Sequence, residues 1–322
     1  MTRPLSRRQA LSAMLGGIFA FTARGAGGAD LRGIYPIVQT PYTKDDAVDF
    51  KALEAEVRFL DKTGVHGIVW PQRASQYQYL SFEERIEGAE RIAAANEGLR
   101  PKLVIGVQGP DAATAVRYAK HAQKLKPDAI IALPTRDKGE FDLDEVLAYY
   151  EEVAAACDLP LFVQTTGNMS VEFVLGMAER IPTLRYIKDE AGDPIERLEQ
   201  FRKATKGKPP YPFTGSHGRT LYDEMLRGVW GNMPASSWVE LYVDCWDHYH
   251  AGRHTEAIAA LSKALMFVEQ AVAYGFPALS YVLHLRGVFP EYGVRGGLRP
   301  LDDSAKKALR ATYEFVKPSL RA

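Results

Sequence analysis

Short hydrophobic runs alternate with amphipathic segments through most of the chain. The intervening segments, such as 49–64 and 111–125, repeat hydrophobic residues at the three- or four-residue spacing of a helix. The eight hydrophobic runs lie at 33–40, 67–70, 102–107, 128–133, 160–165, 184–188, 211–215 and 231–235. Strands that alternate with helices form parallel sheets, and eight such units in about 200 residues favour a (β/α)8 TIM barrel over an open sheet. The eighth run is the weakest, because it is short and contains Pro234.

The pattern changes after residue 237, where only helical spacing follows, at 238–288 and 302–317. We therefore predict an α/β protein in which residues 30–237 form the barrel and residues 238–322 form a helical extension packed on it. No Gly/Ser-rich linker or internal repeat separates the two parts, so we expect one compact unit.

The first residues have the pattern of a targeting signal. Arg7 and Arg8 precede a hydrophobic run from Ala10 to Ala23, which is too short to span a bilayer comfortably. Twin-arginine signals direct export in bacteria. We predict that residues 1–29 are such a signal and that the mature protein is periplasmic or otherwise exported. An uncleaved N-terminal anchor or a chance pair of arginines is the alternative.

Charge and cysteine content narrow the possible partners. Residues 1–29 hold four of the 40 basic residues and no acid, which leaves 36 basic against 40 acidic residues, a net charge of −4, for the rest. A mildly acidic body gives no reason to expect a nucleic acid or an anionic membrane as partner.

Cys157 and Cys245 both lie in segments with helical spacing, so we expect two buried, unpaired thiols rather than a disulfide.

The active site of a (β/α)8 barrel lies at the carboxyl ends of its strands, and this rule selects candidates before any motif is considered. Polar residues at the predicted strand ends are Thr40, Tyr42, Gln72, Arg73, Ser75, Gln76, Gln108, Thr135, Arg136, Gln164, Thr165, Thr166, Lys188, Asp189, Glu190, Ser216, His217, Ser236 and Ser237. No metal-ligand spacing stands out, since His248 and His250 on a helix face apart. Neither a nucleotide-binding glycine motif in a strand–turn–helix context nor a nucleophile elbow is present.

Lys188 is the candidate nucleophile among these residues. It ends the run LRYIK, where burial disfavours a charged ammonium group. A neutral lysine amine can attack a carbonyl, and a second cation such as Arg73 or Arg136 would lower the lysine pKa further. The alternative is that Lys188 pairs with Asp189 or Glu190.

At Lys188 the chain resembles the dihydrodipicolinate synthase / N-acetylneuraminate lyase family, over about residues 31–320. YIKDEAGD at 186–193 is similar to the family's lysine segment, and YLSFEERIEGAE at 79–90 is similar to the helix start after its second strand. GNMPASSW at 231–238 and GVRGGLRPLDDS at 293–304 are similar to its eighth-strand turn and C-terminal segment. The resemblance implies that Lys188 forms a Schiff base with pyruvate or a related 2-oxo acid, without a cofactor, in a homo-oligomer, commonly a tetramer.

Three positions depart from the family's usual motifs. The second-strand loop, usually G-T-T-G-E, is QRASQ, so Arg73 and Ala74 replace a pair of hydroxyls. The tyrosine that relays protons in the family's Y-N-V-P motif corresponds to Gln164, whose amide is no acid or base near neutral pH. After the fourth strand, where some members have a tyrosine that reaches a neighbouring subunit, the chain has Thr135 and Arg136.

Two hypotheses follow. In the first, the chain is a lyase, an aldolase or dehydratase of sugar-acid-like 2-oxo acids and not an ordinary dihydrodipicolinate synthase. Protons would then move through water, a substrate hydroxyl, a threonine or Glu190, while arginines hold the acidic groups of the substrate. The catalytic residues would be Lys188, Gln164 and Thr165, and the substrate would be bound by Arg73, Ala74, Arg136, Thr166 and Ser236. In the second hypothesis, the chain has lost catalysis and binds an acidic metabolite after export. Under either hypothesis, the alternative for Arg73 and Arg136 is that they point into solvent or a subunit contact.

Overall fold

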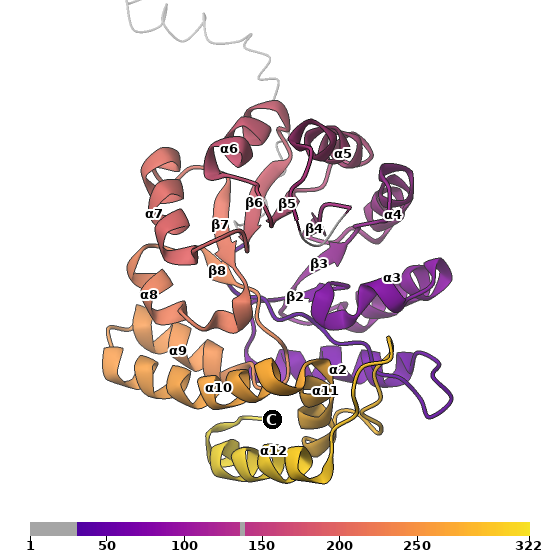
Figure 1. Cartoon of the computed structure of the whole chain (residues 1–322), viewed down its shortest axis with the longest axis vertical. Helices are drawn as coiled ribbons and strands as arrows, with labels where there is room; N and C mark the ends of the chain where they lie inside the picture. Colours follow the sequence, from indigo (N-terminus) through magenta and orange to yellow (C-terminus); the bar gives the residue numbers. More distant parts are fainter. Residues whose placement is uncertain (1–30, 136–138) are drawn as a thin grey trace, which may run out of the picture. The chain divides into compact units, whose positions relative to one another are not determined.

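Eight parallel strands form a single sheet that curves into a barrel in the computed structural model, which describes residues 31–135 and 139–322 (Figure 1). The strands are β1 (Gly33–Ile34), β2 (Gly67–Trp70), β3 (Lys102–Gly106), β4 (Ala129–Ala132), β5 (Leu161–Thr165), β6 (Leu184–Asp189), β7 (Tyr211–Thr214) and β8 (Gly231–Asn232). Their order is β1-β8-β7-β6-β5-β4-β3-β2. The ends of the sheet meet where Val69 N donates to Pro36 O at 3.0 Å and Val38 N donates to Val69 O at 2.9 Å. The predicted TIM barrel is thus confirmed.

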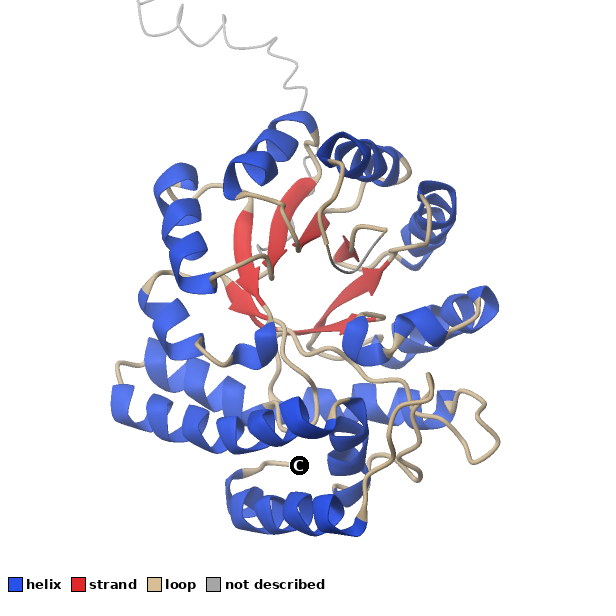
Figure 2. Cartoon of the chain, viewed as in Figure 1, coloured by secondary structure: helices blue, strands red, loops and turns tan. Residues whose placement is uncertain are grey.

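Helices follow the strands and surround them (Figure 2). Those predicted from the hydrophobic spacing are α2 (Phe50–Thr63), α3 (Phe82–Asn96), α4 (Ala112–Leu125), α5 (Leu143–Ala155), α6 (Val171–Arg180) and α7 (Pro194–Thr205). Polar caps fix their starts: Ser81 Oγ, for example, accepts from Glu84 N at 3.1 Å at the start of α3. A short helix, α8 (Leu221–Leu226), was not anticipated. The regular parts of β1 and β8 are short, because Pro36 and Pro234 lack the N–H that a longer strand donates.

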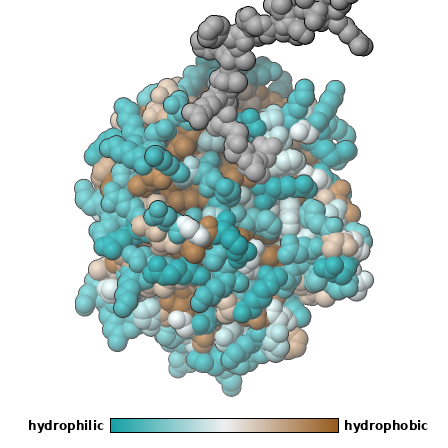
Figure 3. All heavy atoms as spheres, turned by 180° about the vertical axis from the view of Figure 1, so that it is seen from behind, coloured by the Kyte–Doolittle hydropathy of each residue, from teal (hydrophilic) through white to brown (hydrophobic). Residues whose placement is uncertain are grey.

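The C-terminal segment is helical, as its spacing predicts. It forms α9 (Glu240–His250), α10 (His254–Tyr274), α11 (Phe276–Leu285) and α12 (Asp303–Val316), which gather beside α2 and α8 in Figure 1. Residues Leu31–Ala322 make one compact unit. By length and composition alone, α10 would suffice to cross a membrane, a test that buried helices of soluble proteins also meet, and it is the one such helix in the described chain. The face seen in Figure 3 is mainly hydrophilic, with hydrophobic residues in separate groups.

The predicted export signal is not tested by the structure, whereas the prediction for the two cysteines is. Residues 1–29, including Arg7 and Arg8, lie outside the described residues, so the export signal stays a prediction. Cys157 and Cys245 are both buried and free, as expected.

Aromatic side chains fill the barrel below the strand ends. Phe162 of β5 stacks on Tyr186 of β6 with ring centroids 4.5 Å apart, and Phe213 of β7 meets Phe162 edge-on at 5.1 Å. Side chains alternate along a strand, so the next inward positions are Gln164 and Lys188, which are paired in the sheet register. The core therefore places an amide and an amine side by side above an apolar floor.

Removing the buried guanidinium of Arg286 is expected to destabilise the helical extension. Arg286 Nη1 donates to Glu240 Oε2 at 2.9 Å, and the two side chains are 1% and 0% exposed. Arg286→Met leaves the Glu240 charge buried without its partner, so we expect the free energy of unfolding in urea to fall by about 3–5 kcal/mol. Arg202→Met is the control, because Arg202 pairs with Glu199 but is 56% exposed, so its loss should leave the free energy of unfolding nearly unchanged. Equal losses in the two variants would contradict this account.

Candidate active site

Lys188 lies at the carboxyl end of β6 with its side chain buried inside the barrel. The side chain is 5% exposed, and Nζ lies 3.5 Å from Glu190 Oε2. Burial lowers the pKa of Lys188, and the nearby charge of Arg73 lowers it further, while Glu190 opposes both. A larger fraction of this amine is therefore neutral than in a lysine exposed to solvent.

The Glu190 carboxylate accepts hydrogen bonds on both oxygens. Ser216 N donates to Oε1 at 3.0 Å, and Gln164 Nε2 donates to Oε2, the oxygen that faces Lys188. Burial alone would raise the pKa of Glu190, but Lys188, the Ser216 amide and Arg73 outweigh it and hold the pKa below its ordinary value. Glu190 is thus an ionised carboxylate in contact with the candidate nucleophile.

The turn after β7 is shaped to receive this carboxylate. Gly215 leaves room for it, because a Cβ at that position would overlap Oε1 of Glu190. The next two residues, Ser216 and His217, adopt left-handed backbone conformations with φ of 49° and 57°. Such conformations are uncommon for residues other than glycine, and here they follow directly on the amide that binds Glu190.

Thr165 and Asp189 belong to a different cluster, on the outer face of the sheet. Thr165 Oγ1 donates to Asp189 Oδ1 at 2.5 Å, and Arg197 binds Asp189 through Nε to Oδ2 at 2.9 Å and Nη2 to Oδ1 at 2.8 Å. Successive side chains of a strand point to opposite faces, so Thr165 lies opposite to Gln164. The structure therefore places Thr165 in support of β6 and not beside the Lys188 amine, contrary to the catalytic position expected for it.

The loop that departs most from the family pattern is firmly held. Arg73, Ala74 and Ser75 form the 3-10 turn η1 (Arg73–Ser75), in which Ser75 Oγ donates to Val38 O at 2.5 Å. From the C-terminal segment, Arg295 N donates to Gln76 Oε1 at 2.9 Å. Arg73 is half-buried, and its charge acts on both Lys188 and Glu190. Ala74 is half-buried and packs against the core clusters.

The other predicted substrate-binding residues differ in their surroundings. Thr166 follows β5 and is buried. Ser236 is fully buried and accepts from Gln39 Nε2 at 3.2 Å, and it also hydrogen-bonds to the buried Glu56 of α2. The predicted Arg136 lies outside the described residues.

Glu190 and His217 are the site residues that sequence reasoning underestimated. Glu190 entered as one of several proton carriers and, with Asp189, as a possible ion-pair partner of Lys188, and His217 entered only as a polar residue at a strand end. His217 is half-buried, and burial lowers its pKa, with Lys188 lowering it and Glu190 raising it. Both residues are among the polar residues at the predicted strand ends, but position at a strand end does not show which of these residues lie beside Lys188.

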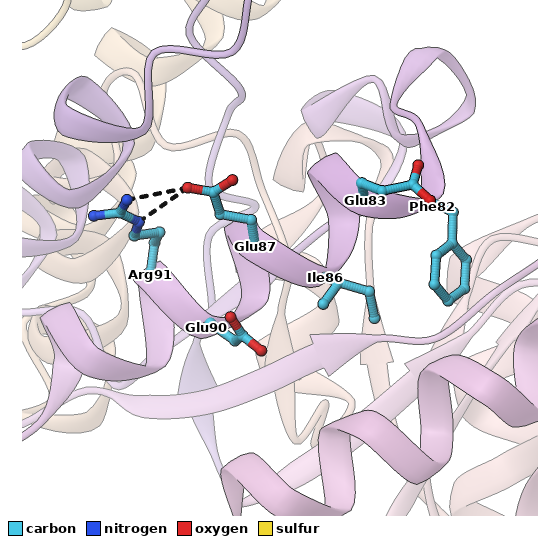
Figure 4. A pocket seen from close by; sticks show the side chains of 6 residues that line it. All are labelled: Phe82, Glu83, Ile86, Glu87, Glu90 and Arg91. Carbon is cyan, nitrogen blue, oxygen red and sulfur yellow. Dashed lines mark hydrogen bonds and ion pairs between the residues drawn. The ribbon is translucent and has the colours of Figure 1, made fainter.

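Two hollows lie apart from Lys188. One, of about 370 Å³, runs along α3 (Figure 4), where Arg91 Nη2 contacts Glu87 Oε1 at 3.0 Å. The other, of about 560 Å³, includes Thr135 and Arg85, and Arg85 Nη2 donates to Gly106 O at 3.0 Å. Within the described ranges, no group of three His, Cys, Asp or Glu residues is arranged to hold a metal ion.

The sequence and the fold are similar to those of known proteins. The model of the dihydrodipicolinate synthetase family matches residues 30–315. An N-acetylneuraminate lyase of Rhizobium meliloti is 29% identical over 304 residues, covering 90% of this chain and 96% of the relative. A probable 2-dehydro-3-deoxy-D-pentonate aldolase of Escherichia coli is 28% identical, covering 78% and 84%. A solved structure of a putative dihydrodipicolinate synthetase from Pseudomonas aeruginosa superposes with a TM-score of 0.82 at 22% identity, covering 88% and 99%.

The buried Glu56 behind Ser236 is expected to make stability depend on pH. Gln39 N donates to its two oxygens at 3.1 and 3.2 Å, and burial raises the pKa of Glu56 from 4.5 to about 8. Between these values the folded protein keeps a proton that the unfolded chain releases, so the contribution of Glu56 to the free energy of unfolding falls as pH rises.

Glu56→Gln cannot titrate, and we expect it to gain stability relative to the wild type from pH 4.5 to about 8, as measured by urea unfolding at a series of pH values. Glu179→Gln, at an exposed helix position, is the control and should follow the wild-type curve. A stability difference between Glu56→Gln and wild type that does not change with pH would contradict the assignment.

Proposed function

The chain belongs to the dihydrodipicolinate synthetase family, and we propose that it is a lyase that forms a Schiff base between Lys188 and a 2-oxo acid of the pyruvate or sugar-acid class. The reaction would be an aldol-type cleavage or condensation, or a dehydration. Relatives named as N-acetylneuraminate lyase and as a probable 2-dehydro-3-deoxy-D-pentonate aldolase support this class of substrate.

The observation that carries the proposal is the buried amine of Lys188 at the mouth of the barrel. An amine attacks a carbonyl carbon only when it is neutral, and burial with Arg73 nearby favours the neutral form. The bond between Nζ and C2 of the 2-oxo acid forms, the bond between C2 and its oxygen breaks, and water leaves. The resulting imine withdraws electrons from the adjacent carbon, where bonds are then made or broken.

The remaining polar groups suit a hydroxylated 2-oxo acid. Arg73 is the cation on the second-strand loop that would hold the substrate carboxylate in place of the family's hydroxyl pair. The buried Oε1 of Gln164 has no hydrogen-bond partner among the described residues, so it can accept a hydrogen bond from a substrate hydroxyl. The absence of a tyrosine at position 164 argues against ordinary dihydrodipicolinate synthesis. The homotetramer expected from the family stays a prediction.

Trapping with borohydride tests the covalent step. The full chain is incubated with pyruvate or another 2-oxo acid and then reduced, and we expect intact-protein mass spectrometry to show one adduct, located on Lys188. Lys188→Met should give none, because it has no amine. If folded wild-type protein forms no adduct with any 2-oxo acid tested, the lyase proposal is wrong and binding without catalysis is favoured.

The role of Arg73 predicts a loss that depends on the substrate carboxylate. We expect Arg73→Ala to need about 10–100 times more pyruvate for half-maximal trapping, the equivalent of a lost charge-assisted hydrogen bond. Methyl pyruvate, which has no negative charge, should lose much less than pyruvate, because the variant then loses only the effect of Arg73 on the pKa of Lys188. The same loss with both compounds would assign Arg73 a structural role instead.

A further inference from the structure

We propose that the Glu190 carboxylate is the general acid–base group of this site, and that Gln164 positions it where the family's tyrosine would act. This inference rests on the proposed Schiff-base function and names the proton carrier that the function requires. Three features of the described structure support it. Glu190 contacts Lys188, the neighbouring polar groups are occupied or unsuited to carry a proton, and the Glu190 carboxylate is held in one position.

Glu190 lies at the reacting amine. Its Oε2 is 3.5 Å from Lys188 Nζ, close enough to exchange a proton with the lysine directly or through one water molecule. With 19% of its side chain exposed, Glu190 also reaches the solvent, with which a proton carrier must exchange. Lys188 has no other acidic partner within 4.0 Å among the described residues.

The neighbouring polar groups are occupied or chemically unsuited. The Gln164 amide neither gives nor takes a proton near neutral pH. Thr165 donates its hydroxyl to Asp189, and Arg197 holds that carboxylate through two nitrogens on the outer face of the sheet. His217, whose pKa responds to both Glu190 and Lys188, is a further titratable neighbour, and the experiment below includes it.

The carboxylate is held by three separate strand ends. Glu190 follows β6, Gln164 of β5 donates to its Oε2, and Ser216 after β7 donates to its Oε1 at 3.0 Å. Gly215 provides the space, and the left-handed backbone of Ser216 and His217 forms the turn. An ion pair with Lys188 needs none of these devices, whereas a group that must return to one position after each proton transfer is served by all of them.

Glu190 takes up and gives back protons in turn as the imine forms. The Lys188 ammonium gives a proton to Glu190, which leaves a neutral amine and a carboxylic acid. The amine adds to C2 of the 2-oxo acid, and a proton moves from nitrogen to oxygen to give the carbinolamine. Glu190 then protonates the departing hydroxyl, so that water leaves and a positively charged imine faces an ionised carboxylate. That carboxylate removes a proton from C3 to give the enamine and can return it.

Exchange of the pyruvate methyl protons with D2O reports on proton removal from C3, and borohydride trapping reports separately on the imine that this step requires. We expect wild type to exchange them and Glu190→Gln to do so about 10²–10⁴ times more slowly, while borohydride still traps pyruvate on Lys188 in the variant. Glu190→Asp should recover part of the rate, and Glu179→Gln, an exposed position, should match wild type.

The outcomes separate the two proposals. Failure to trap pyruvate or other 2-oxo acids in wild type would overturn the Schiff-base function itself. Trapping together with undiminished exchange in Glu190→Gln would overturn the role of Glu190 alone. Loss of exchange in His217→Asn, with normal exchange in Glu190→Gln, would assign the proton transfer to His217 instead.

Two further variants test how Glu190 is held, without removing it. Gln164→Leu deletes a donor to the ionised carboxylate, which raises the pKa of Glu190, so the fall of the exchange rate on the acid side of its pH profile should move to higher pH. A pH profile of unchanged position with a lower maximum rate would mean a structural role for Gln164.

Gly215→Ala should displace the carboxylate and slow exchange while trapping persists. Gly176→Ala is its control, because a Cβ there meets nothing within 4 Å. Wild-type exchange in Gly215→Ala would contradict the proposed position of Glu190.

Discussion

The contact between the Lys188 amine and the Glu190 carboxylate, closed off by the barrel on one side and open to solvent on the other, governs the rest of the site. Burial of the amine costs free energy when it is charged, and the aromatic floor of Phe162, Tyr186 and Phe213 supplies that burial. The carboxylate offsets part of the cost. Because Lys188 is buried and Glu190 is half-buried in contact with it, each affects the protonation state of the other, and neighbouring donors act on the pair as a unit.

The changes from the family pattern are coupled by this contact. An amide at position 164 is a poor substitute for a tyrosine if the tyrosine is considered alone. Beside Glu190 it becomes a donor to a carboxylate, and Gly215 leaves the space that the carboxylate occupies. The substituted loop at 72–76 is likewise hydrogen-bonded to β1's continuation and to the C-terminal segment. The side chains at these altered positions, Gln164, Ser75 and Gln76, are thus each hydrogen-bonded to a neighbouring element.

The supporting groups lie outside the barrel as well as in it. Thr165, Asp189 and Arg197 tie the ends of β5 and β6 to the first turn of α7. This outer cluster fixes the direction in which the inner residues point, because a strand that is held on one face presents its alternate residues to the other. The proposed catalytic residues and the structural residues therefore alternate along the ends of β5 and β6.

The sequence by itself determined the strand–helix alternation, the helical extension and the position of Lys188 at a strand end, because hydrophobic periodicity is a local property. It also showed that the second-strand loop and position 164 were unusual. Only the tertiary structure decided that Thr165 faces outward and that Gln164, Glu190 and Ser216 meet. Those contacts depend on the register between β5 and β6 and on a left-handed turn after β7, and they join residues from three strands. No pattern along one segment contains that information, which is why the sequence offered both Asp189 and Glu190 as partners of Lys188, and only the fold shows that the partner is Glu190.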